Sequence, residues 1–138
     1  MNTGYVREQA HPQRFSALWL AVGLALVVAI SYVLIALQVL AVGDLQTADR
    51  PAAIVLVAAA CYALGGLLIL VRRAWLWMVG AGINLLVILF FVLAYVGRPA
   101  VLFSPGGLAT KGAQILLEVC LLALIVMSWR HQHRGERR

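Results

Sequence analysis

Four long runs of apolar residues, separated by short polar stretches, make up most of the chain. The runs cover residues 16–42, 52–71, 74–96 and 111–129. Each is long enough to cross the ~30 Å hydrocarbon core of a bilayer as an α-helix. The first run is far longer than the ~7–15 residue core of a signal peptide, so we interpret it as a retained span. The pattern predicts an all-α integral membrane protein, an antiparallel four-helix bundle with sequential helices side by side.

The segments outside the spans are polar and basic. Residues 1–15 form an N-terminal segment, and residues 130–138 form a tail that we expect to be disordered. These two segments and the turn Arg72-Arg73 hold eight of the eleven basic residues. By the positive-inside rule, both termini therefore face the cytoplasm. Ten of the eleven basic residues are Arg, which suits a GC-rich bacterial genome, so we place the protein in the bacterial inner membrane.

The composition agrees with a membrane protein, because 64% of the residues are hydrophobic. The net charge is +6. The charge is spread over ends and turns, which indicates contact with anionic lipid headgroups or a partner rather than with nucleic acid. The residues expected to make this contact are Arg72, Arg73, Arg130, Arg134, Arg137 and Arg138.

The intramembrane polar positions that we single out as candidates are Asn84, Gln114 and Glu118. Lys111, Gln114 and Glu118 share one helix face, and Glu118 lies ~10 Å deeper than Lys111. A charged carboxylate at this depth costs a few kcal/mol, so we expect it to be protonated, hydrated or partnered. The candidate partners are Asn84, Gln114, a tyrosine such as Tyr32 or Tyr62, and water.

The second span carries a stripe of small residues at helical spacing. It consists of Ala52, Ala59, Ala63 and Gly66. Small residues let another helix backbone approach closely, and we favour packing within the bundle over self-association.

The connection 97–112 is the longest in the chain. Its Pro and Gly residues are strong helix breakers, so we expect it to lie on the membrane surface or over the mouth of the bundle. We expect Thr110 to cap the last helix.

Chemistry-bearing motifs are absent from the sequence, so we expect no enzyme, cofactor or metal site. Cys61 and Cys120 lie at matching depths in their spans. A disulfide between them is geometrically possible, but two packed thiols are favoured. His131 and His133 in the tail have no third ligand nearby, which favours an incidental basic tail over a metal site.

The stretch from Gly80 to Met127 contains GAGINLLVILFFVLAYV, a Pro/Gly loop, and GLATKGAQILLEVCLLALIV. It resembles small four-span bacterial membrane proteins of uncharacterised function over about a third of the chain. The resemblance implies the four-span fold and brings no activity with it.

Two functional hypotheses follow. The first is a non-catalytic accessory or structural subunit that packs against a larger membrane protein complex, because no catalytic constellation is present. Its partners are membrane lipids and other membrane subunits or itself. The alternative is a small homo-oligomeric proton-coupled transporter that uses Glu118.

Overall fold

The computed structural model describes residues 10–43 and 52–135, and side chains within residues 15–43 and 52–130. Its helices are α1 (Ala10–Ala36), α2 (Ala52–Ile69), α3 (Ala74–Tyr95), α4 (Pro99–Leu102) and α5 (Pro105–Gly135). Within the described residues there are no strands, and four helices are long and apolar enough to cross a membrane. The predicted all-α bundle of four membrane-spanning helices is therefore confirmed.

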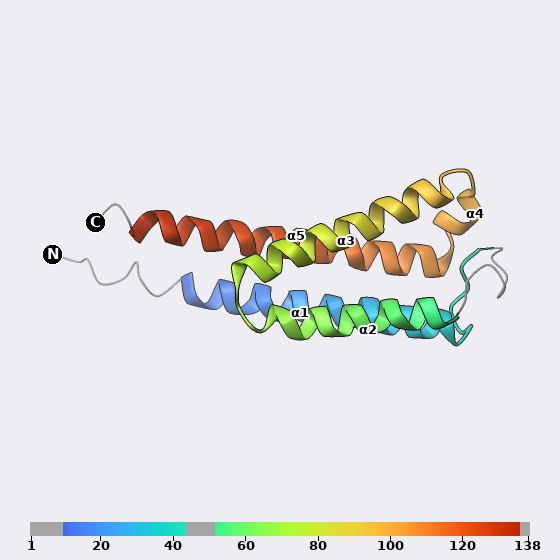
Figure 1. Ribbon diagram of the computed structural model, residues 1–138, viewed down its shortest axis with the longest axis horizontal. Helices are drawn as coiled ribbons and strands as arrows, with labels where there is room; N and C mark the ends of the chain where they lie inside the picture. The colour runs from blue at the N-terminus through green and yellow to red at the C-terminus, as the bar shows by residue number, and fades with distance from the viewer. Residues whose placement is uncertain (1–9, 44–51, 136–138) are drawn as a thin grey trace.

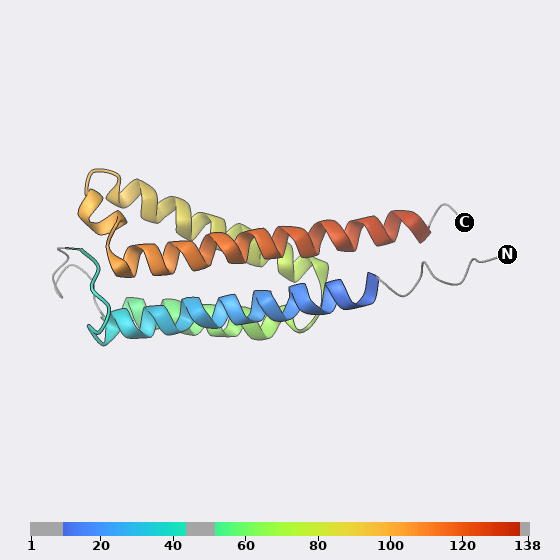
Figure 2. The same ribbon diagram turned by 180° about the vertical axis from the view of Figure 1, so that it is seen from behind.

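The helices run antiparallel along one long axis (Figures 1 and 2). We call the end that carries the α2–α3 connection the Arg72 end, and the opposite end the α4 end. Helix α1 packs along both α2 and α5, and α5 packs along α3, so the order across the bundle is α2, α1, α5, α3.

Helices α2 and α3 are consecutive in the chain but contact each other little. They diverge from their connection toward the α4 end (Figure 1). The expectation that all sequential helices lie side by side is therefore wrong for this pair. The physical reason is that each of the two packs on a different member of the α1–α5 pair.

The first helix ends at Ala36, six residues before the end of the predicted span. Gln38 adopts a left-handed conformation with φ 60°. The Gln38 N–H then bonds the Ile35 carbonyl at 3.1 Å, and the Val39 N–H bonds the Leu34 carbonyl at 2.9 Å. This pair of bonds is the Schellman arrangement, which satisfies the last carbonyls of the helix. The prediction, which used apolar composition alone, therefore placed the end of this helix too late in the chain.

The last helix begins at Pro105, not at residue 111 as predicted. Ser104 is its N-cap, because the Ser104 hydroxyl accepts a hydrogen bond from the Gly107 N–H at 3.0 Å. Proline is well suited to the next position, where no intrahelical N–H bond is needed. Thr110 does not cap the helix as expected, since its hydroxyl donates back to the Gly106 carbonyl at 2.7 Å. Most of the predicted loop 97–112 is therefore helical.

At its other end, α5 continues through Gly135. The disordered tail predicted from residue 130 is therefore wrong for residues 130–135, whereas residues 136–138 lie outside the described part. Arg and Gln in this stretch have good helix propensity, and basic residues near a helix C-terminus interact favourably with its dipole.

Close backbone contacts join the segments at the α4 end. The Gly106 N–H donates to the Ala41 carbonyl at 2.9 Å. A Cβ at Gly107 would lie 2.5 Å from the Val101 carbonyl oxygen, and a Cβ at Gly43 would lie 2.7 Å from that of Ala100. Gly43 also has φ +57°, which favours glycine. These contacts fix α4 and the start of α5 against the end of α1.

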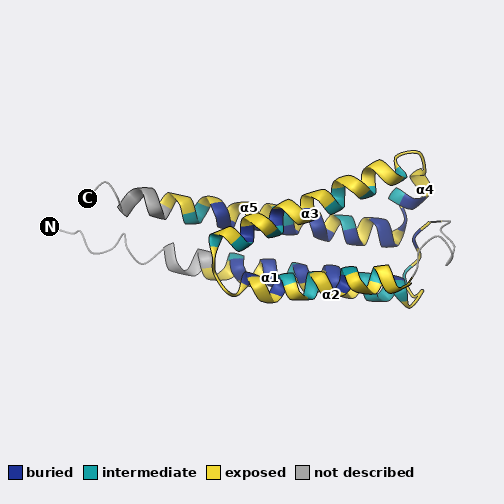
Figure 3. Ribbon diagram, in the orientation of Figure 1, coloured by how far each residue is buried: buried dark blue, intermediate teal, exposed yellow. Residues whose placement is uncertain are grey.

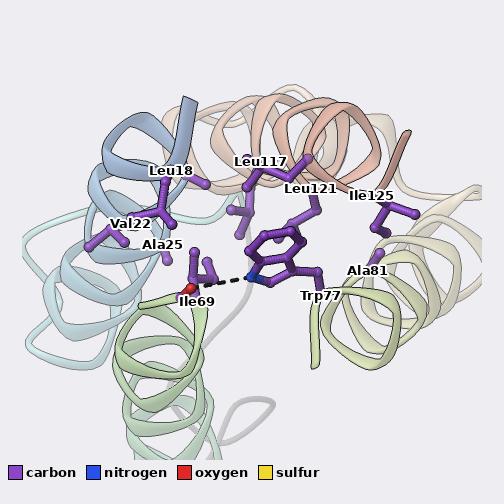
Figure 4. Packing of buried hydrophobic residues seen from close by; sticks show 11 residues of the cluster. Leu18, Val22, Ala25, Ile69, Trp77, Ala81, Leu117, Leu121 and Ile125 are labelled. Atoms are coloured by element: carbon purple, nitrogen blue, oxygen red, sulfur yellow. Dashed lines mark hydrogen bonds between the residues drawn. The ribbon is translucent and has the colours of Figure 1, made fainter. Parts of the chain in front are cut away.

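The half of the bundle nearer the Arg72 end is filled by apolar side chains, which we call the apolar layer (Figure 4). Its buried members are Leu18, Ala21, Val22, Ala25, Ile69, Trp77, Ala81, Leu117, Leu121, Leu124 and Ile125. Trp77 points inward and its indole N–H donates to the Ile69 carbonyl at 3.2 Å, which ties the start of α3 to the end of α2. Trp19, Trp75 and Trp129 are exposed near the same end.

Buried positions concentrate on α1 and α5, whereas α2 and α3 are mostly exposed (Figure 3). In the most apolar window of each span, 44% of α1 and 33% of α5 is buried inside the chain, against 17% of α2 and 17% of α3. Helices α2 and α3 therefore leave most of their apolar surface exposed on the outside of the bundle.

The small-residue stripe of α2 faces α1 in part. Ala59 and Gly66 are buried, Ala63 is half-buried and Ala52 is exposed. A Cβ added at Gly66 would lie 3.3 Å from the Cβ of Ala25, so this glycine allows a close approach to α1.

Candidate functional site

A hydrogen-bonded group of polar side chains lies between the apolar layer and the α4 end, and we call it the polar layer. Its members come from α1, α2, α3 and α5. They are Tyr32, Tyr62, Asn84, Lys111, Gln114 and Glu118. The structure thus brings together the three polar positions identified in the sequence, both tyrosines considered as partners, and Lys111.

Gln114 is the centre of the polar layer and is fully buried. Its side-chain amide N–H₂ donates to the hydroxyls of Tyr32 at 3.1 Å and Tyr62 at 2.6 Å. Its side-chain oxygen accepts from the Lys111 ammonium at 2.6 Å. One side chain on α5 is therefore bonded to α1 and α2, whose tyrosine rings stack with centroids 5.7 Å apart. An amide has the two donors and the acceptor that this position requires.

Asn84 connects α3 to the same layer and is also buried. Its side-chain amide N–H₂ donates to the backbone carbonyl of Gln114 at 3.0 Å and to Glu118 Oε2 at 2.9 Å. Its oxygen accepts from the Tyr62 hydroxyl at 2.9 Å. Asn84 is thus the partner of Glu118 among those considered in the sequence, and the Gln114 side chain is not.

The backbone carbonyl of Gln114 determines which group donates and which accepts in each of the hydrogen bonds that connect Lys111 to Glu118. A carbonyl accepts and never donates, so the nitrogen of the Asn84 amide must face it. The Asn84 oxygen then faces Tyr62, which must donate to it and accept from Gln114. The bonds therefore run from the Lys111 ammonium through Gln114, Tyr62 and Asn84 to Glu118, with each donor pointing toward the carboxyl group.

Glu118 is half-buried and has one carboxyl oxygen bonded to Asn84. Within the described part of the chain, its other oxygen, Oε1, has no hydrogen-bond donor and the residue forms no ion pair. Glu118 accepts the last hydrogen bond in a series that begins at the Lys111 ammonium. A carboxylate is well suited to this position, because it only accepts hydrogen bonds and carries negative charge. Oε1 is therefore the oxygen of this carboxyl group that can accept a further donor without competing with Asn84.

Lys111 lies inside α5 instead of at its start. Its ammonium lies 4.3 Å from the centroid of the Phe91 ring, a cation–π contact that adds to its bond with Gln114. Lys111 is seven residues from Glu118, ~10 Å along the helix, so it is not a direct counter-ion. The sequence prediction placed Lys111 at the start of the last helix because it did not use the Ser104-Pro105 signal for an earlier helix start.

The remaining candidate positions lie elsewhere. Arg72, Arg73 and Arg130 are exposed near the Arg72 end. The side chain of Arg134 and the residues Arg137 and Arg138 lie outside the described part, as do the side chains of the two tail histidines. The cysteines are free, with Cys120 half-buried and Cys61 exposed, so the expectation of a packed thiol is wrong for Cys61. No group of three potential metal ligands gathers within the described residues.

Comparison with known proteins finds no matching family model, no similar curated protein and no similar solved structure. The geometry of the polar layer and the packing of the four helices therefore carry the functional argument.

Proposed function

We propose that this protein is a non-catalytic accessory subunit that packs against a larger membrane protein complex. The observation that carries the proposal is the incomplete packing of α2 and α3, each with 17% of its most apolar window buried in the chain. Membrane helices associate largely through close packing, and these two helices have abundant exposed apolar surface for it.

The bonding within the polar layer also supports a structural role. Asn84, Gln114 and Tyr62 bond to one another and to neighbouring groups in the same chain. Such bonds fix the relative rotation of the helices, because each polar group in the membrane needs a partner. The layer thereby presents the outer faces of α2 and α3 in one arrangement.

Purification in a mild detergent, followed by native mass spectrometry, tests this proposal. An accessory subunit co-purifies with at least one larger membrane protein in a fixed ratio, and the ratio persists when the detergent is exchanged. Recovery of the chain only as a homo-oligomer contradicts the proposal.

A second candidate function is proton-coupled transport by a homo-oligomer. It is favoured by the Glu118 oxygen that has no hydrogen-bond donor among the described residues. Intramembrane carboxyl groups are frequent in proton-linked transport. In this case Glu118→Gln assembles as the parent protein does but fails to complement a deletion strain, because an amide cannot exchange a proton in this way. Full complementation by Glu118→Gln removes the transport hypothesis.

A further inference from the structure

We infer that Glu118 is the contact point for the partner: its Oε1 accepts a hydrogen bond from a basic side chain on a membrane-embedded helix of the partner protein. This inference rests on the function proposed above, and it adds the position of the contact and the chemistry of the partner. Three observations support it: the position of Glu118 on α5, the direction of the hydrogen bonds in the polar layer, and the absence of a basic group bonded to Glu118 among the described residues.

Glu118 stands at the border between the buried and exposed sides of α5. Gln114 and Leu121, one turn away on the inner side, are buried, whereas Ile115 and Leu122, one turn away on the outer side, are exposed. Glu118 itself is half-buried. A helix that packs along the exposed side of α5 therefore comes next to this carboxyl group.

The direction of the internal bonds leaves one atom for the partner. Oε2 receives the Asn84 amide, whose orientation is fixed by the backbone carbonyl of Gln114. Oε1 has no donor within the described residues. An acceptor without a donor inside a membrane span is costly, and membrane proteins satisfy such groups by interhelical bonding.

The balance of charge identifies the partner's side chain. Charged groups within membrane spans pair with one another. The nearest basic group along α5, Lys111, is already bonded to Gln114 and covered by the Phe91 ring. A lysine, an arginine or a protonated histidine from another helix supplies both the missing donor and the missing positive charge.

Photo-crosslinking in the full chain, expressed in its own host cells, tests the inference. Benzoylphenylalanine at Leu122, on the side of Glu118, is compared with the same probe at Leu116, which is also exposed but lies two residues before Glu118 and so on the opposite side of α5. We expect a light-dependent adduct with one other membrane protein from position 122 only. The peptide it captures should come from a membrane span with a basic residue.

The substitution Glu118→Gln separates the contact from the fold. The Gln oxygen still accepts from Asn84, so its amide N–H₂ takes the place of Oε1 and presents a donor to a donor. We expect the adduct and the co-purified partner to fall roughly tenfold, the change that corresponds to one intramembrane bond. Glu118→Asp keeps the carboxylate and should retain more of the partner than Gln does. Thermal unfolding of Glu118→Gln in detergent should match the parent protein, because this variant keeps the bond to Asn84, and a match shows that the fold is kept.

The inference is overturned by an adduct that Glu118→Gln leaves unchanged, by an adduct with a second copy of this chain, or by a captured span without a basic residue. The absence of any adduct at position 122 also overturns it. These results are distinct from failure of the proposed function, in which no larger protein co-purifies even with the parent chain. If co-purification persists at full yield in Glu118→Gln, the accessory role stands and the contact lies elsewhere.

Discussion

The apolar layer and the polar layer join the same helices by different physical means. In the apolar layer, side chains such as Leu121 and Ile125 fill space against α1 and α3, and many combinations of similar shape fill such space equally well. In the polar layer, Gln114 bonds to three other side chains at 2.6–3.1 Å, and no other rotation of α5 preserves all three. Packing therefore holds the helices together, whereas the polar layer selects one arrangement of them.

The comparison is tested most directly by replacing Gln114 with leucine, which has a similar volume. This change removes the bonds to Tyr32, Tyr62 and Lys111. Tyr62 keeps its bond to Asn84 and Lys111 keeps its contact with the Phe91 ring, whereas the Tyr32 hydroxyl loses its bond to the polar layer. We expect the free energy of unfolding in mixed micelles to fall by about 2–3 kcal/mol, since intramembrane hydrogen bonds contribute ~0.6–1.7 kcal/mol each. The control is Leu121→Met in the apolar layer, which should cost less than ~1.5 kcal/mol. An equal cost at both positions contradicts the distinction between the layers.

The position of the polar layer depends on where α5 begins, and Gly107→Ala tests that dependence. The new Cβ would lie 2.5 Å from the Val101 carbonyl oxygen, so α4 or α5 must shift. We expect a loss of about 1–3 kcal/mol in the same unfolding measurement. Gly112→Ala is the matched control on α5, because nothing lies within 4 Å of its added Cβ, and it should raise stability by ~0.5–1 kcal/mol. A loss of equal size in both variants would point to a general effect of alanine at these sites.

A single hydrogen bond in the apolar layer provides the next test. Trp77→Phe removes the indole N–H that donates to the Ile69 carbonyl at 3.2 Å but keeps an aromatic ring in the core. We expect a loss of about 1 kcal/mol in thermal or detergent unfolding, smaller than that of Gln114→Leu. Trp75→Phe, at an exposed position of the same turn, should change stability by less than half as much. The prediction fails when Trp75→Phe is the more damaging of the two.

The smallest effect is expected at the α2–α3 connection, outside both layers. Arg72 has φ 57°, a left-handed conformation that costs a residue with a side chain ~1 kcal/mol relative to glycine. Arg72→Gly should therefore raise the free energy of unfolding by about 0.5–1 kcal/mol. Arg72→Ala is the control, because it removes the same positive charge but keeps the Cβ that the left-handed conformation disfavours. An increase in Arg72→Ala as large as that in Arg72→Gly assigns the effect to lost positive charge instead.

The number and nature of the spans followed from the sequence alone. In lipid, a spanning segment must satisfy its backbone hydrogen bonds internally, so a long apolar run in this chain forms a helix whatever its neighbours are. That Asn84 and Glu118 lie within such helices followed in the same way, from their positions within their runs. The start of α5 was also encoded locally, in Ser104-Pro105, but Pro and Gly in that stretch were interpreted only as helix breakers.

The tertiary structure decided which of these residues meet. The bond between Gln114 and Tyr32 joins positions 82 residues apart, and the bond between Gln114 and Tyr62 joins positions 52 residues apart. Hydropathy does not encode such pairs, because every apolar face of a helix is equally soluble in lipid and several rotations are acceptable to the membrane. The divergence of α2 and α3 has the same origin. Side-chain packing places α2 against α1 and α3 against α5. Because α3 packs on α5, Asn84 lies within hydrogen-bond distance of Glu118.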